Sequence, residues 1–266
     1  MCAQQRVPEL TEPVADMRRW QSDVPITTES ALRALHEGEL TVAGRVSEAS
    51  NLVLWCELRV PWALPRGAES IHAVYKPIRG ERPLADFPTG TLALREEAAW
   101  HVSEVTGWSI VPPTLVRDGP AGRGMVQVWI EADDDTDILR MILTRDDRLR
   151  RMAVFDVLVN NADRKGGHLL VTTDGVHGCD HGICFSSEPK LRTVLWGWRG
   201  EPLLDEERDM LERVCTSLDG SLSERLAPLL DVDEIEAIRS RATHLLRDGR
   251  LPVPDPYRHV VPWPPF

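Results

Sequence analysis

Two acidic residues, Asp163 and Asp180, lie in the stretch that is richest in chemically active side chains. Residues 158–186 read LVNNADRKGGHLLVTTDGVHGCDHGICFS. Asp163 comes just after the end of an expected helix, in a loop whose two glycines allow the backbone to approach a ligand closely. Asp180 follows the short β-like run HLLVTTDG, where a hairpin would hold its carboxylate beside Asp163. Two carboxylates in one cleft are poor for stability but suit a magnesium ion, so the pair predicts a cation site.

Lysine usage points to phosphate chemistry. Lys76 ends a predicted strand in VYKP, and the other lysines are Lys165 and Lys190 in a chain that otherwise uses arginine. Phosphoryl transfer from ATP needs an ammonium on the phosphates, a carboxylate that holds it, a group that orients the acceptor hydroxyl, and oxygen ligands for a metal. Glu96 and Glu97 begin the next predicted helix and offer that carboxylate, and helical periodicity does not choose between them.

The elements that must position these residues fall into two halves. The run TTESALRALHEGEL predicts a short helix with Thr28 as its cap, and residues 40–78 predict a meander of antiparallel strands. LALREEAAWHVSEVTG predicts a helix, and VPPTLVRD and RGMVQVWIE predict two further strands. After the acidic break EADDDTD, four helices are expected, in RDDRLRRMAVFDVLVNN, LERVCTSL, SLSERLAPLL and VDEIEAIRSRATHLLRDG. This order predicts an α+β fold with two lobes.

The predicted domain organisation has four parts. Residues 1–27 form an N-terminal arm, and residues 28–132 form an N-lobe with a nucleotide-binding sheet and a helix. Residues 133–250 form a helical C-lobe that carries the catalytic and metal-binding loops. Residues 251–266 form a proline-rich tail that packs on the domain, because its aromatic and valine side chains would be costly to leave in water.

Charge and composition exclude several classes of partner. The 266 residues carry a net charge of -11 and no run of basic residues, so nucleic acid and anionic membrane surfaces would be repelled. No window of about 20 apolar residues is present, and the first residues lack the apolar core of a signal peptide. The five cysteines are scattered, as expected of reduced thiols. We expect a cytoplasmic protein with no nucleic-acid partner and no stable membrane association.

Two motifs resemble a known group of kinases. VNNADRKGGHLL and CDHGICF resemble the catalytic and metal-binding loops of the phosphoinositide 3- and 4-kinase-like superfamily, which includes the bacterial HipA-type kinases. More closely, the chain from about residue 40 onward resembles an uncharacterised actinobacterial phosphatidylinositol-kinase-like family. The segments that carry this resemblance are ASNLVL, VYKPIRGERPL, LALREEAAW, GWSIVPPT, NNADRKGGHLL, DHGICF, PKLRTVLWGW and PWPPF. It implies a protein-kinase-like fold with an antiparallel-sheet N-lobe and a mainly helical C-lobe.

The resemblance also implies roles for individual residues. Asp163 would be the catalytic aspartate, Asp180 a metal ligand, Lys76 the phosphate lysine and Glu96 its partner. The remaining implied contacts are Ser50 and Asn51 in the loop over the phosphates, and Trp129, Ile130 and Glu131 beside adenine. His168 stands where these kinases usually have a metal-binding asparagine. Imidazole suits manganese or zinc better than magnesium, so the expected cofactors are ATP with Mg²⁺ or Mn²⁺.

These observations favour an atypical kinase that moves the γ-phosphate of ATP to a hydroxyl. With no membrane-binding patch, a protein serine or threonine or a small molecule is the expected acceptor, in preference to a membrane lipid. A pseudokinase or nucleotide-sensing module is an alternative, because SEASNLVLW has no glycine and His168 replaces asparagine. Further alternatives are a phosphoinositide kinase and a zinc protein. The zinc site would use His168, His177, Cys179, His181 and Cys184.

Overall fold

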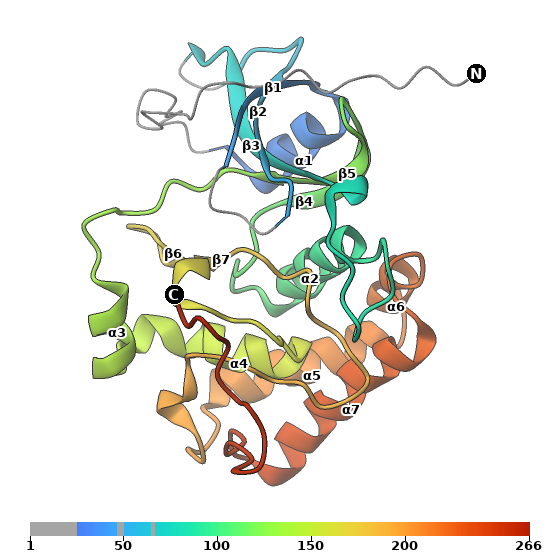
Figure 1. The fold of residues 1–266 in the computed structure, drawn as a ribbon. Helices are drawn as coiled ribbons and strands as arrows, with labels where there is room; N and C mark the ends of the chain where they lie inside the picture. Colours follow the sequence, from blue (N-terminus) through green and yellow to red (C-terminus); the bar gives the residue numbers. More distant parts are fainter. Residues whose placement is uncertain (1–25, 47–50, 65–66) are drawn as a thin grey trace. The chain divides into compact units, whose positions relative to one another are not determined.

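The computed structural model of the protein describes residues 26–46, 51–64 and 67–266. These residues form two compact units (Figure 1). The first comprises the described residues up to Ala93 together with Pro113–Trp129, and the second comprises Leu94–Pro112 and Ile130–Phe266. The first is built on an antiparallel sheet and the second is mainly helical, so the predicted α+β class is confirmed.

The first unit consists of one helix and a five-stranded antiparallel sheet. Helix α1 spans Thr28–Glu37, and the strands pair in the order β1-β2-β3-β5-β4. The strand bounds are Glu39–Arg45, Leu54–Arg59, Ser70–Pro77, Thr114–Gly119 and Gly122–Val128 for β1 to β5. The cap of α1 is Thr27 and not Thr28, because the Thr27 hydroxyl accepts a hydrogen bond from Ser30 N at 3.2 Å. The predicted cap was therefore wrong by one residue.

The side chains of strand β3 alternate between the two faces of the sheet. Ile71, Ala73 and Tyr75 point into a core that also contains α1 residues such as Leu35, whereas alternate positions lie on the other face. Because successive side chains of a strand point to opposite faces, Lys76 shares the second face with His72 and Val74. On that face the indole of Trp55 stacks on the His72 imidazole, with the ring centroids 4.7 Å apart.

Helix α2 (Leu92–Thr106) runs from the first unit into the second. Its first turn is capped by the Glu81 carboxylate, which accepts hydrogen bonds from Leu92 N and Ala93 N at 3.4 and 2.9 Å. A carboxylate at this end satisfies backbone donors that have no partner in the helix and also interacts favourably with the helix dipole. Gly107, with φ of 69°, ends the helix as the sequence predicted.

The second unit contains the remaining helices and a small hairpin. The helices are α3 (Ile138–Thr144), α4 (Arg150–Val159), α5 (Asp205–Leu218), α6 (Ser221–Leu226) and α7 (Val232–Asp248). Helix α4 begins later than RDDRLRR predicted, because Asp147–Leu149 form a separate 3-10 turn. The strands β6 (Leu169–Val171) and β7 (Val176–Gly178) form the hairpin expected in HLLVTTDG. Along the described residues, every helix is too short or too polar to cross a membrane.

Residues 251–266 run in an irregular conformation along the second unit, in dark red in Figure 1. Val260 O accepts hydrogen bonds from Thr193 N at 3.0 Å and from Trp196 Nε1 at 2.8 Å. Pro265 O accepts a hydrogen bond from Gly166 N at 2.8 Å. The tail is therefore bonded both to the segment after Asp180 and to the loop that carries Asp163.

Candidate active site

Asp163 lies four residues beyond Val159, the last residue of α4. Asn160 ends that helix in the left-handed conformation with φ of 53°, which turns the chain into the loop. The Asn161 side-chain oxygen then accepts a hydrogen bond from Asp163 N at 2.9 Å. The Asp163 carboxylate pairs with the Lys165 ammonium at 3.2 Å, and both side chains remain about one quarter exposed. The loop thus presents a carboxylate to solvent from a fixed backbone.

His168 and Asp180 meet across the hairpin. His168 ends the 3-10 turn Gly166–His168, and Asp180 follows β7. The His168 Nε2 atom lies 3.4 Å from Asp180 Oδ2, while its Nδ1 atom accepts a hydrogen bond from Lys165 N at 3.5 Å. Asp180 has φ of 58°, a left-handed conformation that non-glycine residues adopt rarely and that is enriched at functional sites.

The environment of Asp163 alters its acidity. Partial burial raises the pKa of the Asp163 carboxyl, and the nearby Asp180 charge raises it further. The Lys165 ammonium and the Arg192 guanidinium act in the opposite direction and lower this pKa, but burial dominates. A carboxylate with a raised pKa is a better proton acceptor than an ordinary surface aspartate.

A buried polar network lies beneath this loop, and the sequence reasoning missed it. The fully buried Arg164 guanidinium pairs with the fully buried Asp156 carboxylate, with Nε 3.0 Å from Oδ1. Asp156 also accepts hydrogen bonds from Asn161 Nδ2 at 3.0 Å and from Thr193 Oγ1 at 3.1 Å. A buried charge that is paired and hydrogen-bonded in this way fixes geometry, since each alternative arrangement leaves it unsatisfied.

Arg164 also connects the two motifs to each other. It donates to His168 O at 3.3 Å and to Cys179 O at 3.1 Å, and its Nη2 atom lies 2.6 Å from His181 Nε2. Because guanidinium can only donate, His181 Nε2 is the acceptor. One buried side chain therefore holds the backbone on both sides of the hairpin. In the sequence, Arg164 directly follows the loop aspartate Asp163. It could not be recognised as special there, because arginine is common in this chain.

The structure distinguishes Glu96 from Glu97. The buried Glu96 carboxylate accepts a hydrogen bond from His181 N at 2.9 Å, so it contacts the residue after Asp180. Glu97 lies 3.7 Å from His101 Nε2 one turn further along the same helix. Glu96 is therefore the glutamate of α2 that faces the Asp180 motif.

Of the predicted nucleotide contacts in the first unit, Lys76 lies in strand β3. Lys76 stands opposite Met125 in the β3–β5 pairing, on the sheet face that also carries Trp55. Asn51 accepts a hydrogen bond from Arg82 N at 2.9 Å through its side-chain oxygen. Ser50 lies outside the described residues. Lys76 belongs to the first unit and Glu96 to the second, so the proposed pair between them stays a prediction.

Trp129, Ile130 and Glu131 come directly after β5, which ends at Val128. Trp129 N donates to His72 O at 2.9 Å, so the first of these residues continues the pairing of β5 with β3. Ile130 and Glu131 begin the segment that belongs to the second unit. The strand expected in MVQVWIE is thus shorter than predicted, and the adenine contact of these residues stays a prediction.

The site offers few protein atoms that could bind a metal ion. Among the described residues, no group of three or more histidine, cysteine, aspartate or glutamate side chains could hold a metal ion. This finding speaks against the alternative of a zinc site built from His168, His177, Cys179, His181 and Cys184. The adjacent His168 and Asp180 fit a divalent cation that takes its other ligands from nucleotide phosphates, as magnesium commonly does in phosphoryl-transfer sites.

Comparison with known proteins identifies the family. No protein-family model matches the chain. Protein Rv2133c of Mycobacterium tuberculosis is 45% identical over 268 residues, covering 87% of this chain and 94% of the relative. The chain belongs to the Rv2133c family. A second relative, phosphatidylinositol 4-kinase gamma 4 of Oryza sativa subsp. japonica, is 28% identical over 165 residues, which cover 48% of this chain and 29% of that protein.

The solved structure of hydra Fam20 with sugar shows the same fold. It matches with a TM-score of 0.56 over 86% of this chain and 89% of its own, at 16% sequence identity. This chain therefore has a kinase-like fold, which agrees with the two-lobed architecture predicted from the sequence.

Proposed function

We propose that this member of the Rv2133c family is an atypical kinase that transfers the γ-phosphate of ATP to a hydroxyl group with the help of a divalent metal. The observation that carries the proposal is the meeting of His168 and Asp180 beside Asp163, held together by one buried arginine. The kinase-like fold and the partial similarity to a phosphatidylinositol 4-kinase support it.

In the proposed reaction, Asp163 orients the acceptor hydroxyl and accepts its proton. The acceptor oxygen forms a bond to the γ-phosphorus while the bond to the bridging oxygen of ADP breaks. Asp180 and His168 would hold Mg²⁺ or Mn²⁺, which neutralises phosphate charge when bound. Lys76 would contact the phosphates, Glu96 would fix its position, and Asn51 and Trp129 to Glu131 would surround the nucleotide. The acceptor is a small molecule or a protein hydroxyl.

Two substitutions separate the proposed roles. Asp180→Ala should abolish metal-dependent ATP binding, whereas Asp163→Asn should leave binding nearly intact and reduce transfer by about 10²- to 10⁴-fold, the usual contribution of a general base. Calorimetry measures the binding, and γ-labelled ATP with Mg²⁺ or Mn²⁺ measures the transfer. Asn keeps the shape of Asp163, so a loss of binding in both variants would contradict the assignment.

The same experiment tests the alternative that the protein is a pseudokinase or a nucleotide-sensing module. His168 replaces an expected metal-binding asparagine, and the Asp163 carboxylate is already paired with Lys165. ATP binding by the wild type without label transfer to any protein, lipid or small-molecule fraction would favour this alternative. Label in the lipid fraction would instead favour a phosphoinositide kinase.

A further inference from the structure

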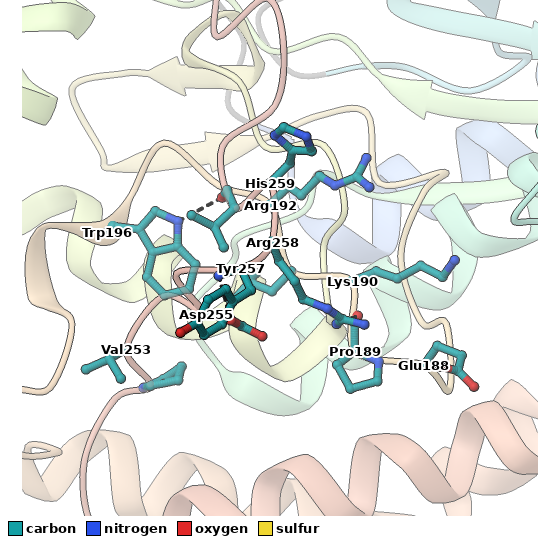
Figure 2. Close-up of a pocket in the computed structure, with 13 residues that line it drawn as sticks. Glu188, Pro189, Lys190, Arg192, Trp196, Val253, Asp255, Tyr257, Arg258 and His259 are labelled. Carbon is teal, nitrogen blue, oxygen red and sulfur yellow. Dashed lines mark hydrogen bonds between the residues drawn. The ribbon is translucent and has the colours of Figure 1, made fainter.

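A cavity of about 520 Å³ lies in the second unit. Asp163 does not line it, but one wall segment is hydrogen-bonded to the loop that carries Asp163. Its walls come from residues 188–192 and 196 and from tail residues 252, 253, 255 and 257–260 (Figure 2). Side chains that could contact a ligand are those of Lys190, Arg192, Trp196, Tyr257, Arg258 and His259. A cavity of this volume is in the range that binds small molecules.

The cavity has more cationic than anionic groups. Lys190, Arg192 and Arg258 outnumber the two acidic residues of the lining, Glu188 and Asp255. The chain as a whole has a net charge of -11, so the positive excess in the cavity is opposite in sign to the charge of the whole chain. The Asp255 carboxylate also accepts a hydrogen bond from Tyr257 N at 2.9 Å. The charge of the cavity therefore favours an anionic ligand.

The cavity wall and the loop of Asp163 share a hydrogen-bonded backbone. Lys190 N donates to the side-chain oxygen of the buried Asn160 at 2.9 Å. Arg192 N donates to Asn161 O at 2.9 Å, and Arg164 N donates to Arg192 O at 3.0 Å. The Arg192 charge also acts on the Asp163 carboxyl. A ligand held by Arg192 would therefore lie close to the proposed proton acceptor.

Two aromatic residues give the cavity an apolar surface. Trp196 is held in place by the hydrogen bond from its Nε1 atom to Val260 O, drawn dashed in Figure 2. Tyr257 also belongs to the lining, and because this residue is 95% exposed, it stands in solvent at the margin of the cavity. Aromatic faces combined with a few cationic groups suit a molecule that has both a carbon skeleton and an anionic group.

We propose that this cavity binds the acceptor of the reaction, and that the acceptor is a small soluble hydroxyl compound that carries a phosphate group. This inference rests on the proposed kinase function. Arginine suits phosphate because its planar guanidinium donates two parallel hydrogen bonds. The phosphate anchors the ligand at Arg192, and the ligand's hydroxyl loses its proton to Asp163 as the oxygen bonds to the γ-phosphorus of ATP and ADP leaves.

The test uses glucose 6-phosphate and glucose as a matched pair of probes in calorimetry with the full chain and no nucleotide. Glucose 6-phosphate should bind saturably and at least about tenfold more tightly than glucose, because a hydrogen bond to a charged group contributes about that factor. Arg192→Gln should weaken binding by about tenfold, and higher salt should weaken it as well. Arg247→Gln is the control, because Arg247 is an exposed residue of α7 outside the cavity.

Several outcomes would overturn the inference. Equal affinity of the wild type and Arg192→Gln for glucose 6-phosphate would do so, as would a wild type that binds neither glucose 6-phosphate nor inorganic phosphate at low salt. Arg192-dependent binding only to vesicles that contain phosphatidylinositol 4-phosphate would replace the soluble acceptor with a lipid. The calorimetry contains no ATP, so its result does not depend on the kinase function. Arg192-dependent binding of glucose 6-phosphate, combined with no label transfer in the separate experiment with γ-labelled ATP, would refute the kinase function and the acceptor role and would leave only an anion site.

Discussion

Two layers of the loop around Asp163 differ in how their charges are paired. In the buried layer, Arg164 and Asp156 are inaccessible to solvent and make hydrogen bonds to side chains and backbone on all sides. In the partly exposed layer, Asp163 pairs with Lys165 at 3.2 Å, and both side chains are about one quarter exposed. The residues of the two ion pairs are close in sequence, because Arg164 lies between Asp163 and Lys165. Buried charge fixes the backbone, and exposed charge remains available to a substrate.

The difference predicts which substitutions affect folding and which affect chemistry. Removing one partner of a buried pair leaves the other charge unpaired in a medium that solvates it poorly. Removing one partner of an exposed pair lets water take its place, so little stability is lost. The adjacent positions Arg164 and Lys165 allow this contrast to be measured within one turn of chain.

The largest effect is expected from Arg164→Leu. This substitution should lower the free energy of unfolding by about 3–5 kcal/mol, because Asp156 would be left buried and charged. Lys165→Leu, the matched control, should lower it by no more than about 1 kcal/mol. Urea denaturation followed by circular dichroism measures both values. Equal losses in the two variants would refute the proposed division into a structural and a chemical layer.

A smaller effect is expected where the tail contacts the loop. A Cβ atom on Gly166 would collide with the ring of Phe266, whereas one on Gly167 would meet no atom within 4 Å. Gly166→Ala should therefore lower the free energy of unfolding by about 1–3 kcal/mol, the usual cost of overpacking, and Gly167→Ala should not show this loss. Thermal and urea denaturation measure the difference.

A double variant tests the cause of that effect. Phe266→Ala should make the Gly166→Ala substitution milder, because the colliding ring is absent. If Gly166→Ala costs the same in both backgrounds, Phe266 is not the source of the strain.

The third prediction concerns pH. If Asp163 accepts the proton as a carboxylate, phosphoryl transfer should fall as pH decreases through its raised pKa, at a higher pH than for a fully solvated aspartate. Lys165 lowers that pKa, so Lys165→Ala should move the acidic limb of the pH–rate profile to still higher pH. Lys165→Arg keeps the positive charge and should move it less. An acidic limb that stays in place in Lys165→Ala would show that Asp163 does not control it.

The elements of the fold could be predicted from the sequence to a large extent. Runs rich in strand-forming residues located the sheet of the first unit, and glycines marked the ends of α2 and α7. Helix α3 (Ile138–Thr144) was not predicted. Other errors lay at element boundaries, as at Thr27, because a threonine on either side can serve as a cap and only the hydrogen bond to Ser30 N selects one. Local signals sufficed because helices and strands depend mainly on neighbouring residues.

The candidate site could be predicted only in its exposed layer. Asp163, His168 and Asp180 stood out because their types and spacing are unusual in a loop. Glu96 could not be separated from Glu97 by periodicity, since adjacent positions on a helix differ only in the direction they face. The hydrogen bond from His181 N selects Glu96, and His181 is 85 residues away in the chain.

The sequence by itself determined which side chains this protein has for chemistry and which elements carry them, because those properties depend on residue type and local spacing. Only the tertiary structure decided that Arg164 and Asp156 form the buried support of the loop, and that Arg192 and Arg258 line one cavity with the tail. In the sequence these residues are indistinguishable from the many other charged residues of the chain. They differ from the other charged residues in their burial and in their pairing with residues that are distant in the sequence. Both properties arise only when distant segments pack together.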